Sequence, residues 1–518
     1  MVGRLNYNLD RFKARFLRAI TLISCVTIAI AMLNGCELSP NGSDDEDNEP
    51  ISAFELYYPS RLPIGTELPY VLREVNTSPR LLGWETANIT TTLQFKQVQL
   101  KRGFGSGRLS QFGQGVTHLS VANGSILAEG DVEFLELPER SIAGTLAGSD
   151  LNWNADTVIV VTDNITVPSG SILRVTEGTV VLLHADVRLD VEGEILVSGT
   201  REAPVLFTAV NPGMDWGEIN IASGYAQFEW TFFTHGGGDE SRSFGHSNSQ
   251  PVLRVDEAIA LLNHCFFLDN EGKAIGSREA QVTMDSSLVM RNDTGGEHHR
   301  SVVMISNTGF LDMPTDDGVF VDDDNDAIYL NGAFDESSYS EITDCVFVTG
   351  KDDAIDHNGA LLRISNCLIE DFAHEGVAAS NTNRAYVLNT LILGCNQGIE
   401  AGYGTPEVIV DHCVLVGNNI GLRFGDEYTS MDDNGNMTIT NTISVENLLH
   451  NVWNYDPLLE GPRDDVMSIT YSMVNDTLYD NETGNVTGEV TWLEGYLLAP
   501  NSVGVGMAED GSDMGLIP

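Results

Sequence analysis

The chain has 518 residues, of which 42% are hydrophobic, so it can bury a sizeable core, and its length suggests about two or three domains. It carries 27 Lys and Arg residues against 75 Asp and Glu residues, which gives a formal net charge of −48. A surface this acidic repels nucleic acid and anionic lipid headgroups, so nucleic-acid partners are excluded. Divalent cations and high-salt surroundings suit such a surface, and general solubility is the simpler alternative.

Residues 1–35 have the pattern of a targeting segment. A basic run, Arg11 to Arg18, precedes an apolar stretch from Ala19 to Leu33, which is short for a membrane span and fits a signal peptide. The stretch ends in "LNGC", which resembles the bacterial lipoprotein signal box. This resemblance implies cleavage before Cys36 and lipidation of its thiol, and Glu37 in the next position implies sorting to a Gram-negative outer membrane. An uncleaved membrane anchor is the alternative.

Two segments separate this signal from the rest of the chain. Residues 36–50, which contain "SPNGSDDEDNEP", are predicted to form a disordered acidic tether whose charges repel one another. Residues 51–145 contain alternating stretches such as "TTTLQFKQVQL" and glycine turns such as "RGFGSGR". These features predict a small antiparallel β domain of the sandwich type. No strand-then-helix pattern follows "GFGSG", so a phosphate-binding loop is not expected there.

Residues 146–475 contain an internal repeat. The segments "LNHCFFL", "ITDCVFV", "ISNCLIE" and "VDHCVLV" align on four cysteines, and the same frame continues through small hydroxyl residues. The aligned positions are Thr231, Cys265, Ser287, Thr308, Cys345, Cys367, Thr390, Cys413, Thr442 and Ser472. The most frequent step between neighbours is close to 22 residues. One such unit cannot bury its own apolar face, whereas stacked units can, so the repeat predicts a solenoid.

This repeat resembles the right-handed parallel β-helix of secreted bacterial proteins. The resemblance implies an all-β fold in which a β-helix over residues 146–475 follows the small domain, and "LAPNSVGVGMAEDGSDMG" resembles the C-terminal closing segment, residues 476–518. The small residues would form an inward ladder, and residues just before them, such as Asn366 and Asn389, would stack their amides. The cysteines would be core thiols, with a Cys345–Cys367 disulfide left open. The fold hosts many activities, so function depends on the site.

A second column of repeat positions aligns Ile328, Ile355, Val377, Ile399 and Leu422. Two positions earlier stand Asp326, Asp353, Glu375, Gln397 and Ile420, and one position later stand Tyr329, Asp356, Ala378, Glu400 and Arg423. Neighbouring coils lie ~4.8 Å apart, so Asp326, Asp353 and Glu375 would be stacked carboxylates. Three acids this close cannot all stay ionised without a shared proton, a cation or displaced loops. The sequence therefore predicts a functional column here.

One interpretation of this column is catalytic. Carboxyl groups two coils apart would be ~9.6 Å from each other, at the edge of the ~6.5–9.5 Å gap of inverting glycosidases. The segment resembles the polygalacturonase-like hydrolases, whose motifs are N-T-D, D-D, G-H-G and R-I-K. Asp326 matches the first motif and Asp352 with Asp353 the second, but His374 falls one position early and no lysine follows Arg423 at the expected spacing. The candidate catalytic residues are Asp326, Asp352, Asp353, His374, Glu375 and Arg423, and the candidate substrate-binding residues are Tyr329, Lys351, Asp356 and Glu400.

Two further interpretations remain open. A polysaccharide lyase would need a basic residue, for which Lys351, Arg363, Arg384 and Arg423 are candidates. A structural calcium site is the third interpretation, because Asp322, Asp324 and Asp326 have the alternating spacing of hard-cation loops. The sequence thus predicts a monomeric, outer-membrane-anchored lipoprotein that binds and in one alternative cleaves a polysaccharide or other extracellular glycan. Calcium is the candidate cofactor, and a purely structural, calcium-braced surface protein is the other alternative.

Overall fold

The structure is a computed structural model that describes residues 53–75, 88–91, 97–110, 113–123, 126–314, 324–425, 434–454 and 466–517. Residues 50–518 form one compact unit. The predicted signal peptide, the lipidation site Cys36 and the acidic tether lie outside the described residues, as does Asp322. Among the residues that are described, no helix has both the length and the apolar character needed to cross a membrane.

The first strands form a small β domain, as the sequence predicts. One antiparallel sheet contains β1 (Ala53–Tyr57), β3 (Leu68–Val75) and β6 (Phe104–Leu109). A second sheet has the order β2 (Arg61–Pro63), β8 (Ile126–Leu135), β7 (Gly115–Asn123), β4 (Asn88–Thr91) and β5 (Gln97–Gln99), in which only the β2–β8 pair is parallel. Alternating burial, as in the pattern of Val132 and Phe134 along β8, gives each strand one apolar face for the core.

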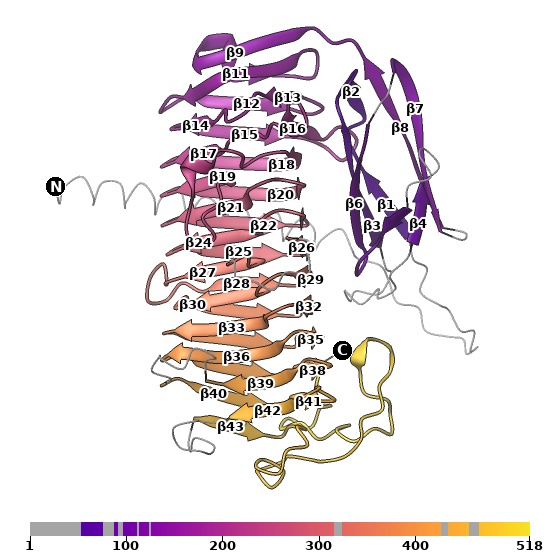
Figure 1. Cartoon of the computed structure of the whole chain (residues 1–518), viewed down its shortest axis with the longest axis vertical. Helices are drawn as coiled ribbons and strands as arrows, with labels where there is room; N and C mark the ends of the chain where they lie inside the picture. Colours follow the sequence, from indigo (N-terminus) through magenta and orange to yellow (C-terminus); the bar gives the residue numbers. More distant parts are fainter. Residues whose placement is uncertain are drawn as a thin grey trace, which may run out of the picture. The chain divides into compact units, whose positions relative to one another are not determined.

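The rest of the unit is a right-handed parallel β-helix whose strands join in one sheet of 35, running from β9 (Glu139–Thr145) to β43 (Met467–Thr470) (Figure 1). Strand β9 lies within the range expected for the small domain, yet it pairs in parallel with β11 (Val158–Val167). The first coil therefore starts before residue 146. Three short 3-10 helices, at Gly148–Leu151, Glu240–Arg242 and Glu494–Tyr496, interrupt the described strands and turns.

Each coil contributes strands to three stacks, named faces A, B and C. Face A holds β10 (Asn152–Trp153), β12 (Ile172–Thr176), β15 (Glu194–Ser198), β18 (Tyr225–Thr234), β20 (Ile259–Leu268), β22 (Gln281–Asp285), β25 (Val302–Ser306), β28 (Ser340–Thr343), β31 (Leu362–Ser365), β34 (Arg384–Leu388), β37 (Glu407–Asp411), β40 (Asn436–Thr440) and β43. Face B holds β13 (Val180–Leu183), β16 (Val205–Ala209), the second halves of β18 and β20, β23 (Leu288–Met290), β26 (Gly309–Met313), β29 (Val346–Gly350), β32 (Leu368–Phe372), β35 (Leu391–Leu393), β38 (Val414–Val416) and β41 (Ile443–Val445). Face C holds β14 (Leu189–Val191), β17 (Ile219–Ala222), β19 (Pro251–Asp256), β21 (Lys273–Arg278), β24 (Gly296–His299), β27 (Ile328–Asn331), β30 (Ile355–Asn358), β33 (Glu375–Asn381), β36 (Gln397–Gly404), β39 (Ile420–Phe424) and β42 (His450–Asn454).

The predicted ladder of small residues is confirmed inside the helix. Thr231 pairs with Cys265, whose backbone N–H donates to the Ser287 hydroxyl at 3.0 Å, and all three residues are at most 1% exposed. The five cysteines from Cys265 to Cys413 are free and buried. The residue before each ladder position has a positive φ, such as 55° at Asn366 and 45° at Asn389. Asparagine tolerates this backbone conformation, and these two amides hydrogen-bond at 2.9 Å, so they form part of the predicted amide stack.

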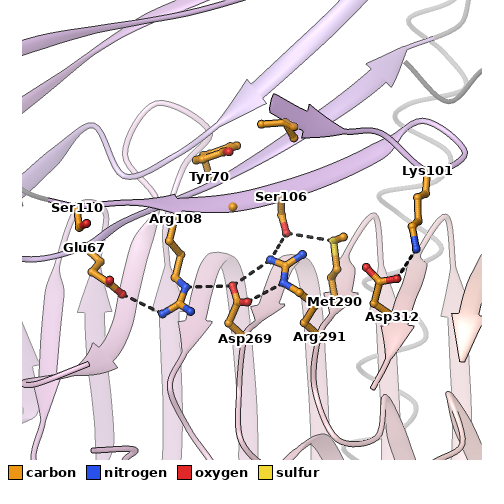
Figure 2. A pocket seen from close by; sticks show the side chains of 12 residues that line it. Glu67, Tyr70, Lys101, Ser106, Arg108, Ser110, Asp269, Met290, Arg291 and Asp312 are labelled. Carbon is orange, nitrogen blue, oxygen red and sulfur yellow. Dashed lines mark hydrogen bonds and ion pairs between the residues drawn. The ribbon is translucent and has the colours of Figure 1, made fainter. Parts of the chain in front are cut away.

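The small domain packs against face B. Tyr57 stacks on Phe266 with ring centroids 5.7 Å apart. Beside this apolar contact lies a polar cavity of about 420 Å³, which Figure 2 shows from close by. Asp269 accepts from Arg291 at 2.6 Å and lies 3.2 Å from Arg108 of the small domain. Arg108–Asp269 and Lys101–Asp312 are the ion pairs of this cavity that cross the contact. The cavity contains none of the candidate site residues.

The closing segment also lies along face B. Its described part, residues 476–517, consists mainly of turns. The backbone N–H of Gly515 donates to the Asn441 carbonyl at 2.7 Å, and that of Ile517 donates to the Asn389 side chain at 2.8 Å. Met514 and Leu516 are buried in the same apolar cluster as Ile443 of β41. The segment therefore covers apolar side chains of the last coils.

Candidate functional site

The register of face C is the one predicted from the repeat. Ile328 of β27 pairs with Ile355 of β30, which pairs with Val377 of β33, and the series continues through Ile399 to Leu422. All five side chains are 0% exposed, because they point into the core of the coil. Strand alternation then places the residues on either side of each apolar position on the opposite side of the sheet.

This register brings six carboxylates together on adjacent coils. We name Asp326, Asp352, Asp353, Asp356, Glu375 and Glu400 the acidic column. Three of its members are nearly inaccessible to solvent: Asp326 is 3% exposed, Asp353 is 6% exposed and Glu375 is 2% exposed. Solvated surface acids would be largely exposed, so the column is not an ordinary charged face. The coil spacing explains the burial, since each side chain lies against its neighbours one coil before and one coil after it.

His374 compensates the charge in the middle of the acidic column. Its Nδ1 atom lies 3.3 Å from an oxygen of Asp352 and 3.3 Å from an oxygen of Asp353, and it also contacts Glu375. Burial by itself lowers the pKa of His374, but hydrogen bonds to these three carboxylates outweigh it and hold the pKa well above its usual value. These three contacts favour the protonated imidazolium form of His374. The Glu375 backbone N–H donates to Asp353 at 2.7 Å and fixes that carboxylate.

A second compensating group lies at the C-terminal end of the acidic column. The amide of Gln397 donates to Glu375, and the Gln397 carbonyl accepts from Arg423 at 3.0 Å. The Arg423 guanidinium also lies 3.6 Å from Glu400. Gln397, a residue without an assigned role in the sequence interpretation, thus connects the acids of β33 to the guanidinium of β39.

At the N-terminal end of the acidic column, the nearest described cation that interacts with Asp326 is the Lys273 ammonium, which is itself paired with Glu297. Among the described residues, the carboxylates of Asp326 and Asp356 have no hydrogen-bond donor and no ion pair. One oxygen each of Asp326, Asp353 and Asp356 lies within 4.8 Å of the others. Burial and then the charges of Asp356 and other nearby carboxylates raise the pKa of Asp326 well above its usual range. Burial followed by repulsion from Asp353 does the same to the pKa values of Asp356 and Glu375.

These carboxylates offer only oxygen ligands, the donor type that hard cations prefer. Asp326, Asp353 and Asp356 form one set that is spaced to hold an ion, and Asp352, Asp353 and His374 form another. The first set suits a hard cation better, because all of its ligand atoms are carboxylate oxygens, whereas the second set includes a histidine nitrogen. Both sets differ from the trio of Asp322, Asp324 and Asp326 that the alternating spacing suggests. In that trio, Asp324 pairs with His246 at 3.0 Å.

The remaining predicted residues lie around the acidic column. Tyr329 and Asp356 pair on neighbouring strands and belong to the outward row, the line of residues that each directly follow an inward apolar residue of face C. Tyr329 is 2% exposed, and its hydroxyl accepts from Asn358 at 2.9 Å. Lys351 is half-buried in the turn before β30, where its backbone N–H donates to the Met313 carbonyl at 3.0 Å. The structure therefore brings the predicted residues that it describes into one neighbourhood. Their assigned chemical roles stay predictions.

His246 is a neighbour that the sequence did not reveal. Its ring stacks on Tyr329 with centroids 5.0 Å apart and planes 9° from parallel. It comes from the loop between β18 and β19, more than 80 residues before Tyr329 in the chain. The unusually long 34-residue step from Thr231 to Cys265 was the one available signal, and it indicates an insertion without giving its path.

Comparisons with known proteins give only distant similarities to solved structures. No protein-family model matches the chain, and no curated protein is significantly similar to it. Among solved structures, the chain is similar to an alginate lyase from Paenibacillus sp. str. FPU-7, with 11% identity, 48% of this chain and 93% of that chain covered, and a TM-score of 0.27. It is also similar to a GH87 α-1,3-glucanase from Streptomyces thermodiastaticus strain HF3-3, with 10% identity, coverage of 85% and 89%, and a TM-score of 0.33. A pectate lyase shares 11% identity over 70% and 88% of the two chains, with a TM-score of 0.25. At this level of similarity, these structures carry no argument about the site.

Proposed function

We propose that the acidic column is a cation-dependent binding site for a linear glycan on a surface-anchored protein. The observation that carries this proposal is the Asp326 carboxylate, which is 3% exposed, makes no hydrogen bond or ion pair among the described residues, and lies against Asp353 and Asp356. A buried carboxylate in this setting needs a proton or a cation. The side chains of the outward row repeat at ~4.8 Å along the helix axis, which suits a ligand that is itself a linear repeat.

Calcium is the cation that we expect, held by Asp326, Asp353 and Asp356. Carboxylate oxygens are its usual ligands, and calcium accepts irregular arrangements that magnesium does not. When bound, calcium would neutralise these acids and attract the carboxylates of an acidic glycan. Asp353 is already oriented by the backbone N–H of Glu375, so it would bind without a further loss of side-chain freedom.

Inverting glycoside hydrolysis is the second candidate, and the raised pKa values of Asp326 and Glu375 favour it. Their coils are two steps apart, which corresponds to ~9.6 Å. A carboxyl group that keeps its proton could protonate the leaving oxygen, while a second carboxylate activates water. A lyase has less support, because Arg423 is already engaged by Gln397 and lies 3.6 Å from Glu400.

A depolymerisation and binding screen over acidic and neutral glycans, with and without calcium, tests these candidates. New reducing ends alone would indicate a hydrolase, and reducing ends with ultraviolet-absorbing unsaturated uronates would indicate a lyase. Binding that requires calcium, without either product, would support the proposed binding function. Asp353→Asn should remove both calcium and glycan binding while leaving calcium-free melting nearly unchanged. If this variant and the wild type show the same binding and the same calcium-dependent melting, the proposal is wrong.

We also propose that the protein is a monomeric lipoprotein whose Cys36 carries the lipid at the outer membrane. This proposal follows from the signal-like segment and "LNGC". An acidic tether would hold the folded unit away from anionic headgroups. Fractionation of a Cys36→Ser variant tests the anchor.

A further inference from the structure

The outward row of face C continues from the acidic column toward the N-terminal coils. Tyr329 pairs with Glu297 of β24, and Glu297 pairs with Gly276 of β21. A glycan that follows the row past Asp326 would therefore have to pass over Tyr329, Glu297 and Gly276 in turn.

The loop between β18 and β19, residues 235–250, occupies that path. Phe244 of this loop is 2% exposed and lies over Gly276, where an added Cβ would be 3.0 Å from the Phe244 ring. A Cβ on Gly245 would overlap the Glu297 carboxylate. The two glycines thus allow the loop to lie directly on the strands of face C, and no room for a sugar remains there.

A buried ion pair fastens the loop. The Lys273 side chain is 0% exposed, and its ammonium donates to the Phe244 carbonyl at 2.6 Å and to the Ser247 hydroxyl at 2.8 Å. The same ammonium pairs with Glu297, which also accepts from the His246 backbone N–H. Every proton of the ammonium has an acceptor, so its burial is compensated. Opening the loop would leave the Lys273–Glu297 pair between β21 and β24 in place, but it would remove two of the three acceptors of the ammonium, at Phe244 and Ser247.

The tip of the loop faces the acidic column. The His246 ring covers Tyr329, its Nδ1 atom pairs with Asp324 at 3.0 Å, and 49% of its side chain is exposed. The imidazole therefore stands as a wall one coil before Asp356, with its exposed part available to a ligand.

We infer that the row is closed at this end, so that the site receives the terminus of a glycan chain, with the terminal sugar against His246. This inference rests on the proposed function and adds the substrate class, namely chain ends. A sugar presents an apolar C–H face to an aromatic ring, so packing against His246 would contribute to affinity as other aromatic contacts do.

The test uses purified full-length protein with calcium and two probes, linear galacturonate and linear glucan, each fractionated by chain length. The measured capacity is the amount of protein that a constant mass of sugar binds at saturation. If only chain ends bind, halving the mean chain length doubles the capacity. His246→Ala should weaken binding roughly fivefold, whereas His118→Ala, an exposed histidine of the small domain, should leave it unchanged. Replacing residues 238–249 by a short Gly-Ser turn should make the capacity depend on the mass of sugar and no longer on the number of chain ends.

The outcomes separate this inference from the proposed function. Wild-type binding that follows sugar mass at every chain length would overturn the closed end and leave glycan binding intact. Absence of binding to both probes, with no effect of calcium on melting, would overturn the proposed function itself. If the turn variant does not fold, the capacity measurement on the wild type and the affinity of His246→Ala still decide the question.

Discussion

Replacing Asp326 by asparagine should change stability in opposite directions with and without calcium. Without calcium, wild-type Asp326 must keep a proton or remain an uncompensated buried anion. Its pKa lies above the unfolded value, so the native state binds more protons than the unfolded chain at pH values between the two. Stability is therefore lost as the pH rises through this interval, by about 1.4 kcal/mol per pH unit for each such group. Asparagine carries no charge, so Asp326→Asn should flatten this slope and raise the melting temperature at neutral pH.

With calcium, the same substitution should be unfavourable. An ion that binds only the native state stabilises it by about 2.7 kcal/mol when its concentration is about a hundred times the dissociation constant. Loss of one of three oxygen ligands should remove most of this stabilisation. The assay is differential scanning calorimetry from about pH 5 to pH 8, in chelator and in calcium, and Asp156→Asn, an exposed carboxylate, is the matched control. A variant that is less stable than wild type in chelator, together with a wild type that does not respond to calcium, would refute the reasoning.

Three further predictions concern the core, the electrostatics and the anchor. Val377→Asp places an uncompensated charge at a position that is 0% exposed, so it should lower the free energy of unfolding by several kcal/mol. Val116→Asp, at an exposed valine, is the control and should change the free energy of unfolding little. Equal melting temperatures of the two variants would show that Val377 does not point inward. His374→Gln should destabilise the protein most at low pH. The raised pKa of His374 means that its stabilisation of the fold is complete below about pH 6.5 and declines as the pH rises toward the pKa of the folded protein. A stability difference between variant and wild type that stays constant with pH would contradict the assignment of an imidazolium. Cys36→Ser should release the protein from the membrane fraction, and a variant that stays with the membrane would exclude a lipid anchor.

The β-helix and the register of face C could be predicted because the same physical constraint recurs in every coil. Each coil must bury one residue at the position of Ile355 and one small residue at the position of Cys367, so a shift by one residue would expose a core side chain. A single unit carries little information, but the repetition over many coils fixes the alignment. The start of the helix was harder to place, because β9 joins the first coil without a member of the ladder.

The surroundings of the acidic column could not be predicted in the same way. Strand alternation predicts that Asp356, one position after the inward Ile355, faces out of the coil, but it does not indicate whether other side chains cover it. The loop that carries His246 is an insertion, and its path depends on individual contacts such as those of the Lys273 ammonium with Phe244 and Ser247. Lys273 by itself looks like any surface lysine, since nothing in the repeat marks its partner on the next coil.

The distribution of compensating charges gives the site a direction. At the C-terminal end, Arg423 reaches Glu375 through Gln397, and in the middle His374 serves three carboxylates, so these acids are balanced within the protein. At the N-terminal end, Asp326 and Asp356 have no described partner and lie next to the wall formed by His246. An external cation would therefore bind where the row is closed. A glycan whose end lies against His246 would bring its terminal unit to this cation, so the two proposals place the ion and the chain end next to each other.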